Sequence, residues 1–395
     1  MKKYISILLI AAILASLCAC KSEVAETPSP TPKEPVTAKV SFVGCGDSII
    51  YKGNIQDAKA LRIDGGREYN FKPIYSEVAE TVKNADISFI NQETVMCGDG
   101  YELSYYPNFN SPQDLGYDLT ELGFDVINIA NNHMLDKGSD GLSRTIEFWK
   151  GMDTLMIGGY ENEADFNASR IIEKNGIKIA FLSYTYDTNG YRVPKNSEIK
   201  IPYIEDEDIK RQAESARNEA DFVAVSVHWG EEGHMVPSTE QKRVAQLMAD
   251  SGVDVIIGHH PHVIQPVEWL TGVNGNKTLC VYSLGNFAAE QAYDYNMVGG
   301  MIKFDFVKTD GQKPYIENVI FNPTVFHYNS NFRGNKVYFM QNYTPELAAK
   351  HGVRGYYKNP LSCEKLLSYA KTTIAPEFLP NELQQKKIRN RILLK

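Results

Sequence analysis

The sequence predicts an α/β fold, in which short buried strands alternate with amphipathic helices. Seven runs rich in Val, Ile and Phe have the length of strands buried on both faces: residues 38–43, 86–90, 126–129, 177–183, 222–227, 253–257 and 279–283. Four stretches between them have the apolar spacing of helices: residues 71–83, 139–150, 205–219 and 239–249. Alternation of these two patterns is typical of α/β proteins.

The first residues have the pattern of an export signal. Lys2 and Lys3 precede an apolar stretch, residues 4–17, that is shorter than the roughly 20 residues of a membrane-spanning helix. The segment Leu17-Cys18-Ala19-Cys20 resembles the lipobox of bacterial lipoproteins, which makes Cys20 the expected lipidation site. Ordinary secretion with cleavage nearby is the alternative. The pattern therefore predicts a protein that is lipid-anchored on the extracytoplasmic face of the bacterial cell membrane.

We divide the chain into four parts. Residues 1–19 are the predicted lipoprotein signal peptide, and residues 20–37 are polar and rich in proline, as expected of a disordered tether. Residues 38–325 hold the predicted strands and form the main domain. Residues 326–395 are expected to form a helical C-terminal extension.

Charge and cysteine content exclude several classes of protein. The net charge of −8 becomes about −10 without the two signal lysines (−8 − 2), and it is spread without a basic block, which argues against nucleic acid as a partner. The other cysteines are Cys45, Cys97, Cys280 and Cys363, and none forms a CxxC pair. Zinc-ribbon and thioredoxin folds are thereby excluded. We expect buried thiols, although an exported location also permits disulfides.

Polar side chains follow six of the seven predicted strands. Five of the eight histidines lie within the 35 residues from His228 to His262. Because the carboxyl ends of strands line the binding crevice of open α/β sheets, these side chains are expected to meet at one rim. The set comprises Asp47, Glu93, Asn131, Asn132, His133, His228, His260, His262 and Asn286.

This mixture of oxygen and nitrogen donors predicts a metal site. Without a thiolate, the set suits Mn, Zn or Fe better than Ca or Cu(I). Six plausible ligands among these nine residues exceed what one four-coordinate ion requires. This number favours two divalent ions with a shared carboxylate. Two adjacent ions suit the hydrolysis of a phosphoester, because they clamp both the attacking and the leaving oxygen.

Six ordered motifs between Val40 and Pro323 resemble the CapA family of poly-gamma-glutamate capsule synthesis proteins. They are Cys45-Gly46-Asp47, Asn91-Gln92-Glu93, the segment from Ala130 to Gly138, His228-Trp229-Gly230, the segment from Gly258 to Val263, and the segment from Ser283 to Phe287. The resemblance implies the calcineurin-like metallophosphoesterase fold, an αββα sandwich. It also implies a role in poly-gamma-glutamate capsule biosynthesis or export.

The resemblance implies a role for each motif residue. Asp47 and His262 would bind one ion, Glu93 would bridge both, and Asn132, His228 and His260 would bind the second. His133 would contact the scissile group as a catalytic residue. Asp136 would orient His133, or alternatively cap the helix that begins near Gly138. Asn131, Ser283 and Asn286 would contact substrate or support the ligands.

Several residues depart from this pattern or lie beside it. Metallophosphoesterases usually begin with Asp-x-His, whereas Ile49 stands here at the histidine position, so one ion can be weak or absent. We interpret His234 as a surface histidine and His259 as a neighbour of the ligands. Aromatic residues in the connection after Glu93 either contact a polymer or glycan, or pack onto their own domain; they include Tyr101, Tyr105, Tyr106, Phe109 and Tyr117.

Two functions remain open from the sequence. The first is a metal-dependent phosphoester hydrolase that serves capsule synthesis, with capsule-synthesis membrane proteins as partners. The second is a non-catalytic assembly protein whose metal-stabilised cleft holds an anionic polymer or a membrane partner. Motifs around metals do not encode the identity of the polymer.

Overall fold

The computed structural model describes residues 35–357 and 360–384. The predicted signal peptide, the lipidation site Cys20 and the tether up to residue 34 lie outside the described residues. The first strand begins at Thr37, the last residue assigned to the tether. None of the described helices combines the length and the apolar composition that crossing a bilayer requires.

The first sheet of the described chain has eight strands, in the order β14-β13-β12-β1-β2-β3-β4, with β11 beside the end of β1. Strands β1 to β4 are parallel, and β12 pairs with β1 in the antiparallel direction. The bounds are β1 Thr37–Ser48, β2 Ile87–Gln92, β3 Val126–Asn128, β4 Leu155–Ile157, β11 Asn286–Ala288, β12 Val298–Thr309, β13 Tyr315–His327 and β14 Lys336–Phe339.

The second sheet of the described chain has six strands, in the order β5-β6-β7-β8-β10-β9. Its four central strands are parallel, and β5 and β9 close the edges in the antiparallel direction. The bounds are β5 Arg170–Lys174, β6 Ile177–Thr185, β7 Phe222–His228, β8 Val255–His259, β9 Val267–Thr271 and β10 Lys277–Val281.

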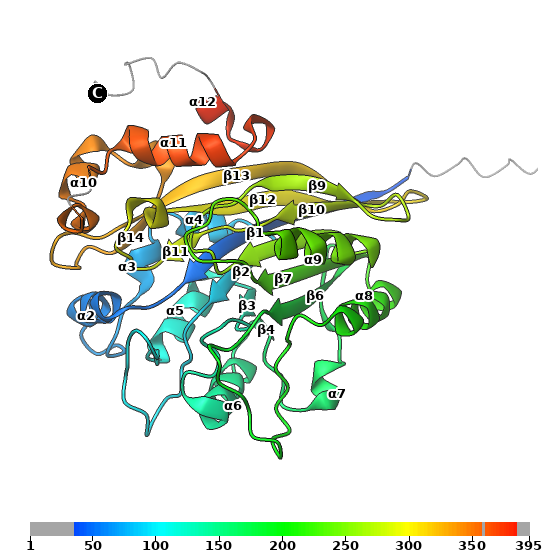
Figure 1. The fold of residues 1–395 in the computed structure, drawn as a ribbon, viewed down its shortest axis with the longest axis horizontal. Coiled ribbons are helices and arrows are strands. Elements are labelled where there is room, and N and C mark those ends of the chain that lie inside the picture. Colours follow the sequence, from blue (N-terminus) through cyan, green and yellow to red (C-terminus); the bar gives the residue numbers. More distant parts are fainter. Residues whose placement is uncertain (1–34, 358–359, 385–395) are drawn as a thin grey trace, which may run out of the picture. The chain divides into compact units, whose positions relative to one another are not determined.

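Helices cover the outer faces of both sheets (Figure 1). The α-helices are α2 Lys52–Ala60, α3 Lys72–Tyr75, α4 Ala79–Lys83, α5 Asp114–Leu122, α6 Gly138–Lys150, α7 Glu163–Phe166, α8 Asp206–Glu219, α9 Thr239–Asp250, α10 Pro345–Lys350, α11 Cys363–Thr373 and α12 Asn381–Gln384. Short 3-10 helices are η1 Asp294–Met297, η2 Met340–Asn342, η3 Gly352–Gly355 and η4 Pro376–Phe378.

Alternation along the strands explains why the two sheets stack between helix layers. In β6, Ile179 and Phe181 join the large core shared with the first sheet, whereas Ala180 and Leu182 pack in the cluster formed with α8 and α9. Side chains that alternate between two faces can be buried on both only where each face is covered. The predicted α/β sandwich of four layers is therefore confirmed.

Aromatic side chains join the two sheets. Phe42 of β1 stacks on Phe181 of β6, with ring centroids 6.4 Å apart, and contacts Phe304 of β12 at 4.8 Å. Phe222 of β7 meets Phe306 of β12 at 4.8 Å. Large rings in the interface bury much apolar area and hold the sheets in a defined relation.

The structure differs from the predicted elements in several places. The stretch 71–83 forms two short helices, α3 and α4, rather than one. Strand β13 runs two residues past the predicted domain boundary at 325, and β14 returns the C-terminal extension to the first sheet. Beyond β14 the described extension is helical, and Leu366 and Ala370 of α11 join the core.

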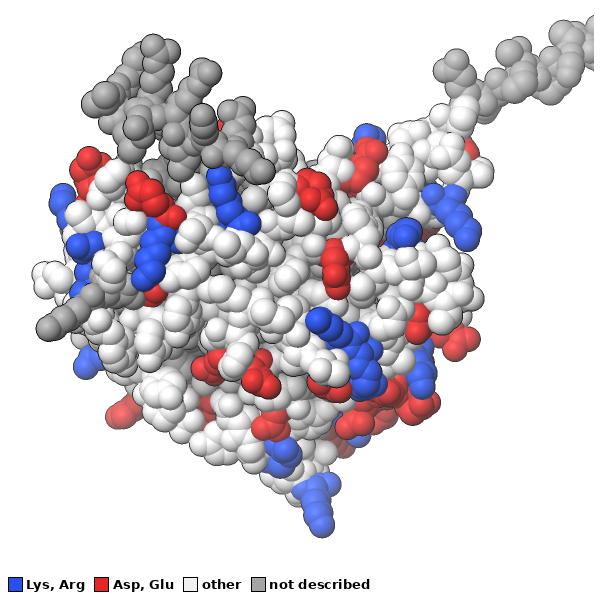
Figure 2. All heavy atoms as spheres, turned by 45° about the horizontal axis from the view of Figure 1, so that its top comes forward, with Lys and Arg blue, Asp and Glu red and all other residues white. Residues whose placement is uncertain are grey.

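The described surface and cysteines match the composition. Acidic and basic side chains are interspersed on the face shown in Figure 2, with uncharged surface between them. The four described cysteines are free, and Cys45, Cys97 and Cys280 are buried. The expectation of buried thiols rather than disulfides is confirmed for these three residues.

We expect Phe42→Ala to lower the free energy of unfolding by about 3–5 kcal/mol, because the lost ring leaves a cavity between the sheets. Urea unfolding followed by tryptophan fluorescence measures the change. Val273→Ala is the control, since this side chain is 75% exposed and its loss should cost less than about 0.5 kcal/mol. A loss below about 1 kcal/mol in Phe42→Ala would contradict the inferred role of the ring.

Candidate metal centre

The predicted ligands meet where parallel strands of both sheets end. Asp47 is the penultimate residue of β1, and Glu93 follows the last residue of β2. His228 ends β7, and His260 follows the last residue of β8. These four side chains come from two sheets and are almost completely buried.

Asp47 accepts four hydrogen bonds, one from its own sheet and three from the end of β8 in the second sheet and the turn after it. Its Oδ1 accepts from Asn91 Nδ2 at 2.9 Å and from His259 Nδ1 at 3.0 Å. Its Oδ2 accepts from the His260 backbone N–H at 3.2 Å and from His262 Nδ1 at 3.1 Å. Burial alone would raise the pKa of Asp47, but the bonds from His259 and His262 outweigh it and hold the pKa well below its usual range.

Glu93 is the shared member of two clusters that could each hold a metal ion. One cluster is Glu93, His260 and His262, and the other is Asp47, Glu93 and His228; within each, the ligand atoms lie within 4.8 Å of one another. Glu93 Oε1 is buried without a hydrogen-bond partner. Burial, and then the charge of Asp47, raise the pKa of Glu93 well above its usual range. A cation at Glu93 would relieve both penalties.

The arrangement of lone pairs also fits a cation. Because the Asp47 carboxylate only accepts hydrogen bonds, His262 carries its proton on Nδ1. The other nitrogen, Nε2, then presents a lone pair 3.7 Å from Glu93 Oε1. A positive ion between these two atoms would be bound by both. The donor set therefore fits the group that the sequence predicts.

Asn132, His228 and His260 form the other side of the cluster. His228 Nε2 lies 3.0 Å from Asn132 Oδ1 and 3.5 Å from Glu93 Oε1. Burial, and then the neighbouring His260, lower the pKa of His228 well below its usual value. Burial, and then His262, lower the pKa of His260 to about 3. Both imidazoles are thus neutral near pH 7, the form that binds metals.

The backbone after β8 is strained where it carries two of the ligands. His260 has φ +96° and His262 has φ +55°, in the left-handed region that non-glycine residues rarely occupy. Each such residue costs about 1–3 kcal/mol, and strain of this kind concentrates at functional sites. The strained turn places the His260 N–H and the His262 ring on the same Asp47 oxygen.

His133 and Asp136 form a hydrogen-bonded pair beside the cluster. His133 Nδ1 lies 2.8 Å from Asp136 Oδ2, and both side chains are nearly buried. The same carboxylate oxygen accepts from the Phe109 backbone N–H at 2.7 Å. Asp136 does not cap α6, whose N-cap is Lys137 without a side-chain bond. Of the two roles predicted for Asp136, the structure places it at His133.

Ile49 has a structural place of its own. It is buried with Phe109 and Ala289 in a small apolar cluster, and its N–H bonds to Ala288 O at 2.8 Å. The Phe109 ring in turn meets the His133 ring edge-on, with centroids 4.8 Å apart. The residue that replaces the expected histidine therefore supports the wall against which His133 packs.

Three predicted supporting residues bond mainly to the backbone. Asn131 donates to Gln92 O and accepts from the His133 N–H at 3.0 Å. Ser283 donates to Val263 O at 2.7 Å. Asn286 donates to Asn296 O, and Asn296 donates to His262 O at 2.9 Å. They hold the loops that carry His133 and His262, whereas contact with a substrate stays a prediction.

A buried chain of amides behind Asp47 was not predicted. Asn91 Nδ2 reaches Asp47, Asn128 Nδ2 donates to Asn91 Oδ1 at 2.8 Å, and Ser183 of β6 donates to Asn128 Oδ1. These residues lie near the ends of apolar strands. The sequence feature that could have predicted them is a polar residue within an apolar run. The chain of bonds links the two sheets directly behind the metal ligands.

Two more residues near the centre emerge only from the tertiary structure. Asn189 accepts from Asn132 Nδ2 at 3.1 Å, and the Tyr186 ring lies over His260 at 4.5 Å. Both belong to a loop that has no sequence pattern of a site. His259 is fully buried on Asp47 and outside both possible clusters, as expected of a neighbour. His234 is a surface histidine, with a side chain 66% exposed.

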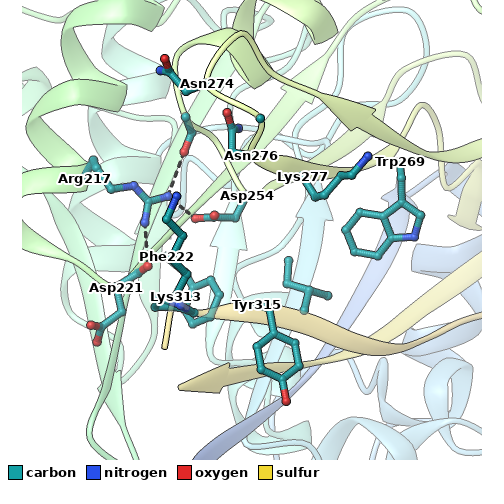
Figure 3. Close-up of a pocket in the computed structure, with 14 residues that line it drawn as sticks. Arg217, Asp221, Phe222, Asp254, Trp269, Asn274, Asn276, Lys277, Lys313 and Tyr315 are labelled. Atoms are coloured by element: carbon teal, nitrogen blue, oxygen red, sulfur yellow. Dashed lines mark hydrogen bonds and ion pairs between the residues drawn. The ribbon is translucent and has the colours of Figure 1, made fainter. Parts of the chain in front are cut away.

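A large groove of about 880 Å³ lies at the amino ends of the strands of the second sheet, away from the predicted ligands at the carboxyl ends (Figure 3). It is lined where β7 and β8 begin, and its carboxylates are paired. Asp254 binds Arg217, and Asp221 binds Lys308 at 2.7 Å. Its lining residues include no histidine or cysteine. The groove is larger than the cavity of about 380 Å³ that His262 lines, but none of the predicted site residues lines it.

Comparisons with known proteins agree on one family. The family model described as "Bacterial capsule synthesis protein PGA_cap" matches residues 41–291. The PGA biosynthesis protein CapA of Bacillus subtilis is 32% identical over 200 residues, which cover 48% of this chain and 49% of that protein. The capsule biosynthesis protein CapA of Bacillus anthracis is 32% identical over 190 residues, which cover 47% and 45%. The chain spans about half the length of these curated relatives.

Among solved structures, a 5'-nucleotidase precursor from Thermus thermophilus aligns with a TM-score of 0.45 and 16% identity. The alignment covers 85% of this chain and 59% of that one. The NAD nucleotidase of Haemophilus influenzae aligns with a TM-score of 0.44 and 13% identity, over 87% of this chain and 57% of that one.

We expect Glu93→Gln to stabilise the metal-free protein at pH 8. Because the pKa of Glu93 is higher in the folded than in the unfolded state, its contribution is lost as pH rises from about 4.5, by up to about 1.4 kcal/mol per pH unit. Urea unfolding in EDTA at pH 4.5 and pH 8 measures the difference between variant and wild type. A difference that is the same at both values would contradict this account of the site.

Proposed function

The chain belongs to the bacterial capsule synthesis protein family PGA_cap, and from this premise we propose that it is a metal-dependent phosphoester hydrolase. We place it in poly-gamma-glutamate capsule biosynthesis or export. The export pattern ending at Cys20 supports a lipid anchor on the extracytoplasmic face of the cell membrane. Capsule-synthesis membrane proteins are the partners that fit this location.

The pairing of His133 with Asp136 is the observation that carries the proposal. A site that only stores metal has no use for an oriented imidazole beside its ligands. Asp136 holds Nδ1, which leaves Nε2 as the nitrogen that can act on a substrate. A carboxylate on Nδ1 also stabilises the imidazolium, so His133 can donate its Nε2 proton to the leaving oxygen of an ester.

The remaining residues hold and shield the reacting groups. Asp47, Glu93, Asn132, His228, His260 and His262 would bind one or two divalent ions. Bound ions of this kind polarise a phosphoryl group and lower the pKa of a coordinated water. The loop with Asn189 bonds to Asn132, and Tyr186 lies over His260, so both of these side chains are buried on this side of the site.

Ile49 favours the second candidate function, a non-catalytic assembly protein. The position that would supply a further ligand instead packs in an apolar cluster with Phe109. A site with fewer ligands binds metal more weakly, and a metal-stabilised cleft can hold an anionic polymer without turnover. Metal content and activity separate the two functions.

We expect the purified protein to bind one or two Mn, Zn or Fe ions per chain, as measured by elemental analysis. His260→Ala should lose at least one ion, because it removes a ligand from a cluster of three. His234→Ala is the matched control from the same region and should retain the wild-type content, since that side chain is exposed. A wild-type protein that binds no divalent ion would exclude the metal centre.

With Mn bound, the protein should hydrolyse bis(p-nitrophenyl) phosphate. Loss of the proton donor in His133→Ala should lower kcat by about 10²–10⁴ fold while the metal content stays at the wild-type level. Asp136→Asn should lower kcat by about 10–100 fold, because it misorients the imidazole. Metal binding with polymer affinity and no hydrolysis would instead establish the assembly function.

A further inference from the structure

A cavity of about 380 Å³ opens beside the ligand His262. We call it the tyrosine cavity. Its walls come from five separate segments: Tyr51, Tyr106, the loop at Glu232 and Gly233, His262, and residues 290–293 with 295–296. Because His262 itself lines the cavity, a group bound there lies next to the metal centre. The volume suits a single ring rather than a long polymer segment.

Aromatic rings dominate the walls of the tyrosine cavity. Tyr293 and Tyr295 are stacked, with centroids 5.1 Å apart and planes inclined by 7°. Tyr357 continues the stack on Tyr293 at 5.0 Å. Across the cavity, Tyr106 is 72% exposed and touches Phe109, the residue that packs against His133. Exposed rings that border a site offer flat faces for stacking.

The charged groups of the tyrosine cavity are acidic. Glu232 and Glu290 line it, and no Lys or Arg stands among its lining residues. Glu290 Oε2 accepts from the Gly53 N–H at 3.0 Å, whereas Oε1 is buried without a hydrogen-bond partner. Burial raises the pKa of Glu290 to about 8, so this carboxyl is mostly uncharged near pH 7. Glu232 is exposed, and its carboxylate accepts hydrogen bonds from hydroxyl groups.

We propose that the tyrosine cavity binds the sugar ring of a sugar-phosphate ester and thereby determines the substrate class of the hydrolase. The inference rests on the proposed function, since it supposes a phosphoryl group at the metal centre. A hydroxylated ring satisfies both features of the wall: its C–H face stacks on tyrosine, and its hydroxyls bond to carboxylates. A flat aromatic ring without hydroxyl groups uses the stacking alone and gives Glu232 no hydroxyl partner.

Kinetics of three esters with the Mn-loaded protein test the inference: glucose 1-phosphate, glycerol 1-phosphate, which lacks a ring, and phenyl phosphate, whose ring has no hydroxyl groups. We expect kcat/KM to be highest for glucose 1-phosphate. Tyr106→Ala and Tyr295→Ala should lower the glucose-to-glycerol ratio about threefold to tenfold, chiefly through KM. Tyr295→Phe should retain the ratio, because the ring remains. Tyr117→Ala is the matched control, since this exposed tyrosine packs on Phe148 outside the cavity.

Binding in a catalytically inactive background separates this inference from the proposed function. In His133→Ala, calorimetry should detect glucose 1-phosphate, and a second substitution, Tyr106→Ala, should weaken its binding about threefold to tenfold. If no ester is turned over but this binding result holds, the hydrolase proposal fails and the sugar subsite stands. Equal kcat/KM for the glucose and glycerol esters, or a preference for phenyl phosphate, would overturn the sugar subsite.

Discussion

The four hydrogen bonds to Asp47 are the constraint on which the rest of the site depends. The carboxylate lies at the end of β1 in the first sheet, and its partners include the backbone and rings at the end of β8 in the second sheet. Removing one buried partner would leave the others uncompensated, so the network acts as a unit. Through it, the packing of two sheets brings together the two clusters that could each hold a metal ion.

Stability and function oppose each other at this centre. Glu93 Oε1 is buried without a donor, two neutral histidines lie beside it, and His260 and His262 have strained backbones. Each feature destabilises the metal-free fold, and each suits the binding of a cation. The large aromatic interface around Phe42 supplies the packing that lets the fold tolerate these costs.

Local sequence patterns were informative where one physical effect dominates. Apolar runs such as residues 222–227 coincide with strands, because a segment buried on both faces must be apolar throughout. Antiparallel β12 and β13 were not predicted, although they join the first sheet to the C-terminal extension. Lys303 in β12 and the exposed positions in the first half of β13 interrupt the hydrophobic pattern, and pairing along the whole strand compensates for it.

The sequence by itself determined the fold class, the family motifs and the donor types at the strand ends, because these depend on composition and short-range order. Only the tertiary structure decided that Asp136 bonds to His133, that Ile49 supports Phe109, and that tyrosines from distant loops share a cavity. Those relations depend on how two sheets bring together residues that lie far apart in the chain. No local pattern encodes such distances, because loop packing sets them.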